Sequence, residues 1–466
     1  MEKHKIGLFV LVMFIIGSID SLRNMPAAAM FGPNLIFFFI VAAIGFLMPI
    51  ALISAELSSY HPNQNGIYQW SKEAFGDKIA LITIWFQWIN TAIWFPTILA
   101  FIASGLAYLI NPNLIEHKWY VVTVILISFW SMTLLSLKNL SISARFAAIC
   151  AIGGFAIPFA VIAILFIVWL VSGHQINYTL SWHTIIPNFT HSNNWIALTA
   201  IITSFLGMEL AAVNVKDIKK PQKKYPIGVI IAATIILATM IFGSLAIAAV
   251  IPSQKISLIS GFFETIDIFL STFHLHWLVI IMCALVVFSS LGEMINWIVS
   301  PARGLQQAAM SGSLPKLLAK ENSQGIPSAV LILQAIITTI VCLCFVFFKS
   351  INNAYWLLTD LSTEIYVLMY VMMFIAALVL HYKHKEVKKP FTLPGGNIGK
   401  WLLCLLGLIS CIITLVIGFV PPSQLDFGAT WHYSVIFAIG ILIMISPALL
   451  LACRKNHTRH RKLNFS

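Results

Sequence analysis

The sequence predicts an all-α integral membrane protein, and three observations support this fold class. Hydrophobic residues make up 59% of the 466 residues and charged residues only 9%, whereas soluble domains carry about a quarter charged residues. The mean hydropathy is +0.92. Apolar runs of about 20 residues, each long enough to cross the hydrocarbon core of a bilayer, recur along the whole chain.

We count twelve such runs and predict one transmembrane helix for each. They are 6–31, 34–58, 79–110, 119–137, 144–172, 195–215, 226–251, 275–300, 328–348, 354–381, 400–420 and 432–453. No stretch between the runs is long enough to hold a separate soluble domain. The chain is therefore predicted to be one polytopic helical unit.

The net charge of +12 is explained by membrane topology. Lysines and arginines gather in alternate connections, whereas the other connections hold only Lys118, Lys255 and Lys349. The positive-inside rule then places both termini in the cytoplasm, as an even number of helices requires. We expect a multi-pass protein of the inner or plasma membrane that contacts lipid and binds no nucleic acid.

Cysteine usage and motifs give no indication of an enzyme. The seven cysteines lie within apolar runs or at their ends, where they suit packing better than a disulfide framework or a metal site. We find no nucleophile motif, metal-ligand cluster or phosphate-binding loop. No metal and no cofactor is expected.

Two of the predicted helices are interrupted. The first contains a polar stretch at 17–26, and the sixth contains Gly207 two residues before Glu209. Non-helical backbone at this depth is tolerated only where it is buried in protein or lines a cavity. The two breaks occupy corresponding positions in two five-helix halves of opposite orientation. Such paired breaks are typical of an inverted-repeat transporter, and they indicate its binding site.

These observations divide the chain into four parts. They are a ten-helix inverted-repeat transport core at 1–382 (repeats at about 6–172 and about 195–382), a cytoplasmic link at 383–399, helices eleven and twelve at 400–453, and a basic cytoplasmic tail at 454–466. The tail is predicted to lie on anionic lipid. Its two histidines leave a pH-responsive flap as an alternative.

Three carboxylates within apolar runs are candidates for proton coupling or gating: Glu209, Glu293 and Glu364. An ionised carboxylate at bilayer depth costs a few kcal/mol, so such a group usually faces a cavity and has a function there. Its charge can then change with pH and with substrate. The alternative is a structural pair that holds helices together.

Asp20 and Arg23 lie three residues apart in the first break, and two interpretations stay open. They can form an ion pair that holds the break in shape. Alternatively, Arg23 binds a substrate carboxylate with its planar guanidinium, and Asp20 meets an amine or a proton. Arg303, at the cytoplasmic mouth, is either a topology charge or a residue that selects substrate.

The chain resembles the amino acid–polyamine–organocation superfamily along nearly its whole length. The motifs that carry the resemblance are the loop with Asn65-Gly66 before Tyr68 and Trp70, Phe205-Leu206-Gly207-Met208-Glu209 through Asn214, Lys220-Pro221 with Tyr225-Pro226, Glu293 through Gly304, Leu314-Pro315, Gly325-Ile326-Pro327, Phe391 through Gly396, and Phe419-Val420-Pro421-Pro422. The stretches around Glu209 and Glu293 are similar to the glutamate:4-aminobutyrate antiporters.

The resemblance implies a LeuT-type five-plus-five fold with broken helices 1 and 6. It implies secondary active, proton-dependent amino acid antiport by alternating access, with an amino acid or amine and protons as the bound species. The substrate-binding residues that it implies, together with nearby candidates, are Gly17, Ser18, Ile19, Asp20, Arg23, Ser204, Phe205, Leu206, Gly207, Trp297 and Tyr366. N–H groups after Gly17 and Ser18 would suit a substrate carboxylate, and carbonyls near Phe205 an ammonium.

Three departures from the family pattern bear on the substrate. They are the charged residues Asp20 and Arg23 in the first break, Asp360 and Glu364 in the tenth helix, and the short C-terminal tail. The alternatives to antiport are an amino-acid/proton symporter for another amino acid and a transporter-like sensor.

Overall fold

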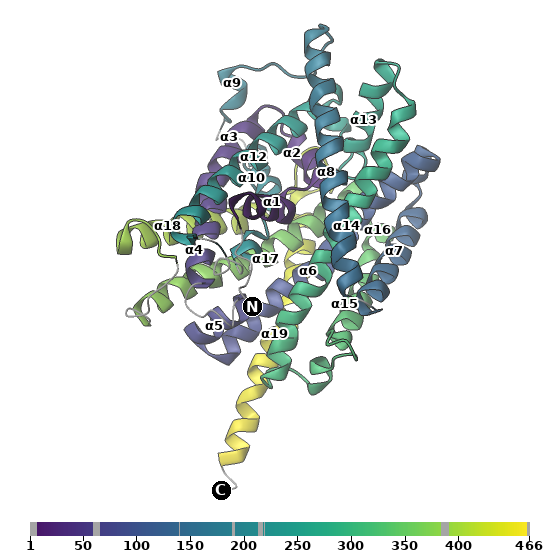
Figure 1. Ribbon diagram of the computed structural model, residues 1–466. Helices are drawn as coiled ribbons and strands as arrows, with labels where there is room; N and C mark the ends of the chain where they lie inside the picture. The colour runs from purple at the N-terminus through teal and green to yellow at the C-terminus, as the bar shows by residue number, and fades with distance from the viewer. Residues whose placement is uncertain are drawn as a thin grey trace.

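The computed structural model describes residues 7–58, 66–138, 140–188, 192–212, 218, 220–383 and 391–463. Within these residues every regular element is a helix (Figure 1). The loop motif before Gly66 and the end of the motif that follows Ala212 lie outside the described residues. So do the side chains of the tail from residue 454 onward.

The helices of the first half begin with two short segments in place of one long helix. In chain order the elements are α1 (Leu8–Ile19), η1 (Leu22–Asn24), α2 (Met25–Ala29), α3 (Asn34–Ala42), the π-helical η2 (Ala43–Leu47), α4 (Met48–Ser58), α5 (Ile67–Phe75), α6 (Asp77–Ile110), η3 (Pro112–Glu116), α7 (Lys118–Lys138), α8 (Leu140–Val171) and α9 (Trp182–Ile185).

The second half also begins with two short helices. The elements are α10 (Ser192–Thr203), α11 (Met208–Ala212), α12 (Pro221–Val250), η5 (Ser253–Lys255), α13 (Gly261–Thr272), α14 (Trp277–Met310), η6 (Lys316–Ala319), α15 (Ser328–Cys342), α16 (Cys344–Phe347), α17 (Ile351–Lys383), α18 (Gly396–Ile417) and α19 (Thr430–Leu463).

The apolar helices make this an integral, multi-pass membrane protein. Nine helices in the described part of the chain are long and apolar enough to cross a bilayer, and the bent pair Leu8–Gly17 and Leu22–Ala29 makes a tenth candidate. Two shorter apolar helices, Ala156–Val171 and Trp195–Leu210, lie in the fifth and sixth predicted runs. Twelve crossings and the inverted repeat stay predictions.

Helix α6 lies at the centre of the bundle and α19 at its edge. Of the most apolar 18-residue window of each helix, 72% is buried in α6 but only 17% in α19 and 28% in α18. Helix α6 packs against α14 and α17, and α1 packs along α12. Apolar side chains on the outer faces of α18 and α19 are exposed, as expected for surfaces that meet lipid.

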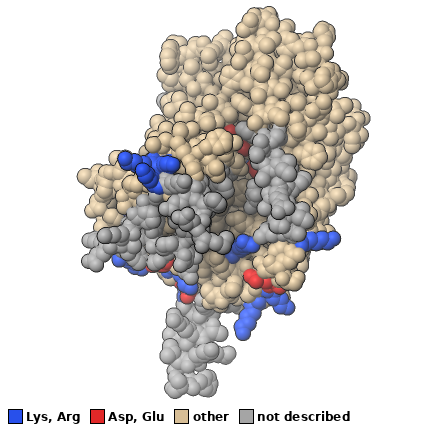
Figure 2. All heavy atoms as spheres, in the orientation of Figure 1, with Lys and Arg blue, Asp and Glu red and all other residues tan. Residues whose placement is uncertain are grey.

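Charged residues are unevenly distributed over the face shown in Figure 2. On this face most of the visible described lysines and arginines lie toward the end where α5 lies, another group lies at the left near α18, and no charged side chain is visible at the opposite end (Figures 1 and 2). A broad apolar surface with basic residues gathered beyond one end of it is typical of a protein inserted in a bilayer. The side on which this end lies stays a prediction.

A buried ion pair joins α18 to α4. Lys400 Nζ lies 2.6 Å from Glu56 Oε1, and both side chains are almost completely buried. Lys400 Nζ also lies 3.1 Å from Nδ1 of His381, which belongs to α17. The pair therefore connects the peripheral helix α18 to two helices of the central bundle.

We predict that Lys400→Met lowers the free energy of unfolding by about 3 to 5 kcal/mol, because it removes the ammonium group that lies 2.6 Å from the buried Glu56 carboxylate. Chemical unfolding in detergent micelles measures this. The control is the double variant Lys400→Met, Glu56→Met, which removes both charges and recovers most of the loss. Equal losses in the single and double variants would show that the ion pair is not the cause.

Candidate functional site

The first break lies at Asp20 and Ser21, within the stretch 17–26 in which we predicted it. Helix α1 continues through Gly17 and Ser18 to Ile19, after which Asp20 (φ −73°, ψ 117°) and Ser21 (φ −138°, ψ 122°) are extended. Gly17 is exposed, and the Ser18 side chain lies outside the described atoms. The N–H groups expected at Gly17 and Ser18 are therefore part of a helix.

The second break lies where we predicted it, between α10 and α11. Residues 204–207 form a turn, and Gly207 has φ 98°, a conformation that residues with a Cβ rarely adopt. The Gly207 N–H donates to the Tyr370 hydroxyl at 2.9 Å. Helix α10 contacts η1 and α2, and α1 contacts α11. The two breaks therefore lie side by side.

Glu209 accepts hydrogen bonds from three uncharged side chains, which we call the Glu209 cluster. Gln87 Nε2 donates to Oε1 at 3.1 Å, Tyr366 donates to Oε1 at 2.5 Å, and Tyr370 donates to Oε2 at 2.5 Å. Only 2% of Glu209 is exposed, and no ion pair to it occurs within the described residues. The cluster ties the second break to α6 and α17.

Arg23 lies buried between α6 and α17. Its Nη1 donates to Thr97 Oγ1 at 2.9 Å and to the Tyr355 hydroxyl at 3.2 Å, and its guanidinium carbon lies 5.1 Å from the centre of the Trp94 ring. The Nε–H has no hydrogen-bond partner. One strong donor of the guanidinium is therefore unused.

Two carboxylates at or beside the first break, Asp20 and Glu293, accept hydrogen bonds from hydroxyl groups. Asp20 Oδ2 accepts from Thr239 at 2.7 Å, and Glu293 Oε2 accepts from Ser21 at 3.0 Å. The described ion pairs do not include one between Asp20 and Arg23. The structure therefore does not contain the ion pair that was the first of our two interpretations.

A small cavity lies between the two breaks. Its volume is about 30 Å³, and it is lined by Ile19, Arg23, Asn24, Asn90, Trp94, Thr203, Leu206, Glu293 and Trp297. This volume accommodates roughly two water molecules. The site is therefore closed in this conformation, and a molecule larger than water enters only if its walls move apart.

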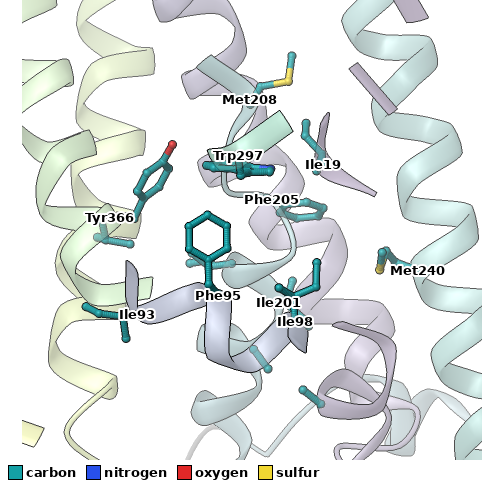
Figure 3. Packing of buried hydrophobic residues seen from close by; sticks show 14 of the residues in the cluster. Ile19, Ile93, Phe95, Ile98, Ile201, Phe205, Met208, Met240, Trp297 and Tyr366 are labelled. Carbon is teal, nitrogen blue, oxygen red and sulfur yellow. The ribbon is translucent and has the colours of Figure 1, made fainter. Parts of the chain in front are cut away.

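Aromatic side chains connect this cavity to the Glu209 cluster. The Trp297 ring lies 5.7 Å from that of Trp94 and 6.1 Å from that of Tyr366. Figure 3 shows Trp297 between Ile19 and Tyr366, with Phe205 close by. Tyr366 in turn donates to Glu209. A movement of the Trp297 ring would therefore alter the cavity and also displace Tyr366, which is bonded to Glu209.

The predicted site residues that line the cavity are Ile19, Arg23, Leu206, Glu293 and Trp297, and the others do not line it. Ser204 donates back to the Ala200 carbonyl at 3.3 Å, and the Phe205 ring packs on Phe39 of α3. Arg303 is exposed and lies ten residues beyond Glu293 on α14, which corresponds to about 15 Å along a helix. Glu364 projects from the side of α17 that faces away from the cavity, and its carboxyl group lies against Gly418 of α18.

Our sequence analysis missed most of the site residues contributed by α6. Gln87 contacts Glu209, and Asn90, Trp94 and Thr97 contact the cavity or Arg23. Their spacings of three, four and three residues place them on one face of the helix. A polar stripe on an otherwise apolar helix is the signal that indicates them. Tyr370 was also missed, one turn from Tyr366.

Comparison with known proteins finds a matching family and several relatives. The amino acid permease family matches residues 6–444. An uncharacterized transporter of Legionella pneumophila is 37% identical over 97% of this chain and 97% of its own length. A glutamate/gamma-aminobutyrate antiporter of Lactococcus lactis is 28% identical over 95% of this chain and 89% of its length. A probable agmatine/putrescine antiporter of the same species is 25% identical over 97% and 96%.

We predict that Tyr370→Phe destabilises the protein more than Tyr366→Phe does. Loss of the Tyr370 hydroxyl leaves both the Gly207 N–H and Glu209 Oε2 without a partner, whereas after Tyr366→Phe Oε1 keeps its bond from Gln87. Each buried group left unpaired costs about 1 to 3 kcal/mol.

Thermal unfolding of the two variants in the same detergent measures the difference. The pair is matched, because each substitution removes one hydroxyl from a buried tyrosine of α17. The reverse order of stability would contradict the arrangement of hydrogen bonds described here.

Proposed function

The chain belongs to the amino acid permease family, and on that premise we propose that it is a secondary active transporter that exchanges glutamate for 4-aminobutyrate in a proton-dependent manner. The family is one of membrane transporters, and relatives named as glutamate/gamma-aminobutyrate antiporters cover nearly the whole chain. The proposal includes twelve crossings, a five-plus-five inverted repeat, and both termini on the cytoplasmic side of the inner membrane.

One observation carries the choice of substrate: the cavity between the breaks holds a guanidinium and a carboxylate. Arg23 and Glu293 both line it, and the Arg23 Nε–H has no partner. We propose that this N–H donates to a substrate carboxylate, and that Glu293 accepts from the substrate ammonium. Backbone carbonyls of the second break would complete the ammonium site. Both glutamate and 4-aminobutyrate carry these two charges.

Arg23 argues against a diamine as the preferred substrate. A polyamine such as putrescine has no carboxylate to meet the guanidinium, and binding it would place like charges together. We therefore take the similarity to a probable agmatine/putrescine antiporter as a similarity of fold and not of substrate. Agmatine and putrescine are accordingly suitable negative controls for transport assays.

Counterflow in proteoliposomes tests this function. Labelled 4-aminobutyrate should accumulate when the vesicles contain glutamate, and much less when they are empty or contain putrescine. Uptake that ignores internal substrate but follows a proton gradient would contradict exchange and favour an amino-acid/proton symporter. Binding without any flux would favour a sensor.

We predict that Arg23→Lys raises the KM for glutamate about 10- to 100-fold, because a lysine cannot reproduce the donor geometry of the guanidinium, and a hydrogen bond to a charged group contributes about 1.5 to 3 kcal/mol. The matched control is Arg303→Lys, the same exchange at an exposed position outside the cavity. An unchanged KM in Arg23→Lys would remove Arg23 from the substrate site.

We further predict that Glu209→Gln still binds substrate but transports it at a rate that no longer depends on pH. The amide cannot take up a proton, although it keeps an oxygen that can accept from the tyrosine hydroxyls. The measurement is exchange rate against pH, with equal pH on both sides of the membrane. An unchanged pH profile would transfer the proton-linked role to Glu293 or another carboxyl.

A further inference from the structure

Two carboxyl groups of α17 lie outside both the cavity and the Glu209 cluster. Asp360 and Glu364 are four residues apart and therefore project from the same face of the helix. Asp360 is 2% exposed and Glu364 is completely buried. Neither has a role in the proposed binding of substrate.

The two groups have too few partners for ionised carboxylates. The Tyr433 hydroxyl of α19 donates to Asp360 Oδ2. Asp360 Oδ1 and both oxygens of Glu364 have no hydrogen-bond partner. A buried carboxylate without donors carries a large desolvation cost, which a neutral acid avoids by keeping its proton.

The surroundings of Glu364 disfavour negative charge further. A Cβ placed on Gly418 would overlap the Glu364 carboxyl group, so this group lies directly against the residue that caps the C-terminus of α18. The carbonyl groups at a helix C-terminus carry partial negative charge. The titratable groups that face the pair are Tyr433 of α19 and Cys411 of α18. Within the described residues neither carboxyl forms an ion pair.

A water-sized cavity lies beside Asp360, and it shares two lining residues with the substrate cavity. A second cavity of about 10 Å³ is lined by Asp360 together with Thr199, Tyr355 and Thr359, and this volume is at the lower limit for one water molecule. Asn24 and Thr203 line this cavity and the larger one alike. Asp360 is thus the member of the pair that water can reach.

We propose that Asp360 and Glu364 form a proton-binding site, separate from Glu209, that takes up and releases a proton during the exchange cycle. Its ligand is a proton delivered by water through the cavity beside Asp360. In the closed conformation described here the pair holds the proton, because no donor compensates an ionised Glu364. Opening of the cavity hydrates Asp360 and allows the proton to leave. Coupling of this site to transport rests on the proposed function.

Infrared spectroscopy of the purified protein at neutral pH tests whether the pair is protonated. We expect a carbonyl band of a protonated carboxylic acid that disappears in Glu364→Gln or Asp360→Asn. The control is Glu264→Gln, which removes a half-buried carboxyl group from α13 and should leave the band in place. A spectrum in which neither Asp360→Asn nor Glu364→Gln changes this band would overturn the proposal.

Exchange driven by a pH gradient tests whether the proton moves. In Glu364→Gln we expect the response of exchange to an imposed gradient to fall about fivefold or more, while exchange at equal pH changes much less. A variant that keeps the full response would show that the proton is permanent, and the proposal would then be wrong. Tyr433→Phe is the positioning control, since it removes the donor to Asp360 but neither carboxyl.

The two measurements separate this inference from the proposed function. The infrared band requires no transport, so it can be present in a protein that exchanges nothing. Robust glutamate exchange with no loss of the band in either variant would contradict the second proton site alone. A variant that fails to fold is recognised by its thermal unfolding, and the other carboxyl is then substituted in its place.

Discussion

An interrupted helix can exist inside a bilayer only where other groups satisfy the backbone that the helix no longer pairs, and the whole site depends on this constraint. Tyr370 meets it at the second break, because its hydroxyl accepts from the Gly207 N–H and donates to Glu209. At the first break Thr239 and Ser21 donate to Asp20 and Glu293. At the second break, the tyrosine that satisfies the freed backbone therefore also holds a carboxylate in place, and at the first break the carboxylates are held by side-chain hydroxyl groups.

The same arrangement leaves the buried charge of Arg23 only partly compensated. Arg23 is surrounded by hydroxyl groups and the face of Trp94, which are weak compensation for a buried cation. A substrate with a carboxylate and an ammonium would supply the missing charge at Arg23 and at Glu293. The closed cavity of about 30 Å³ holds water only. Under the proposed function, binding requires the breaks to move, and this movement would link occupancy of the site to alternating access.

The membrane class could be predicted from the sequence because most of the chain is apolar. The breaks and the main charged residues could be predicted because each is a polar interruption of an apolar run. Glu209, Arg23 and Glu293 are visible for that reason. The contacts between them could not be predicted, since Gln87 and Glu209 are 122 residues apart and their meeting depends on how each helix is rotated. Helix rotation also explains why Glu364, equally conspicuous in the sequence, faces α18 instead of the cavity. The exact position of the first break within 17–26 could not be predicted, because Gly17 is compatible with a helix as well as with a turn.

The central claim is that Arg23 and Glu293 together bind the two charges of one small amino acid. The most direct measurement is the binding of 4-aminobutyrate to the purified protein, compared with butyrate, which lacks the ammonium, and butylamine, which lacks the carboxylate. The account predicts that each analogue binds at least about tenfold more weakly than 4-aminobutyrate, because each leaves one charged partner unpaired. Binding of butylamine as tight as that of 4-aminobutyrate would contradict it, because the site would then recognise a cation and make no use of Arg23.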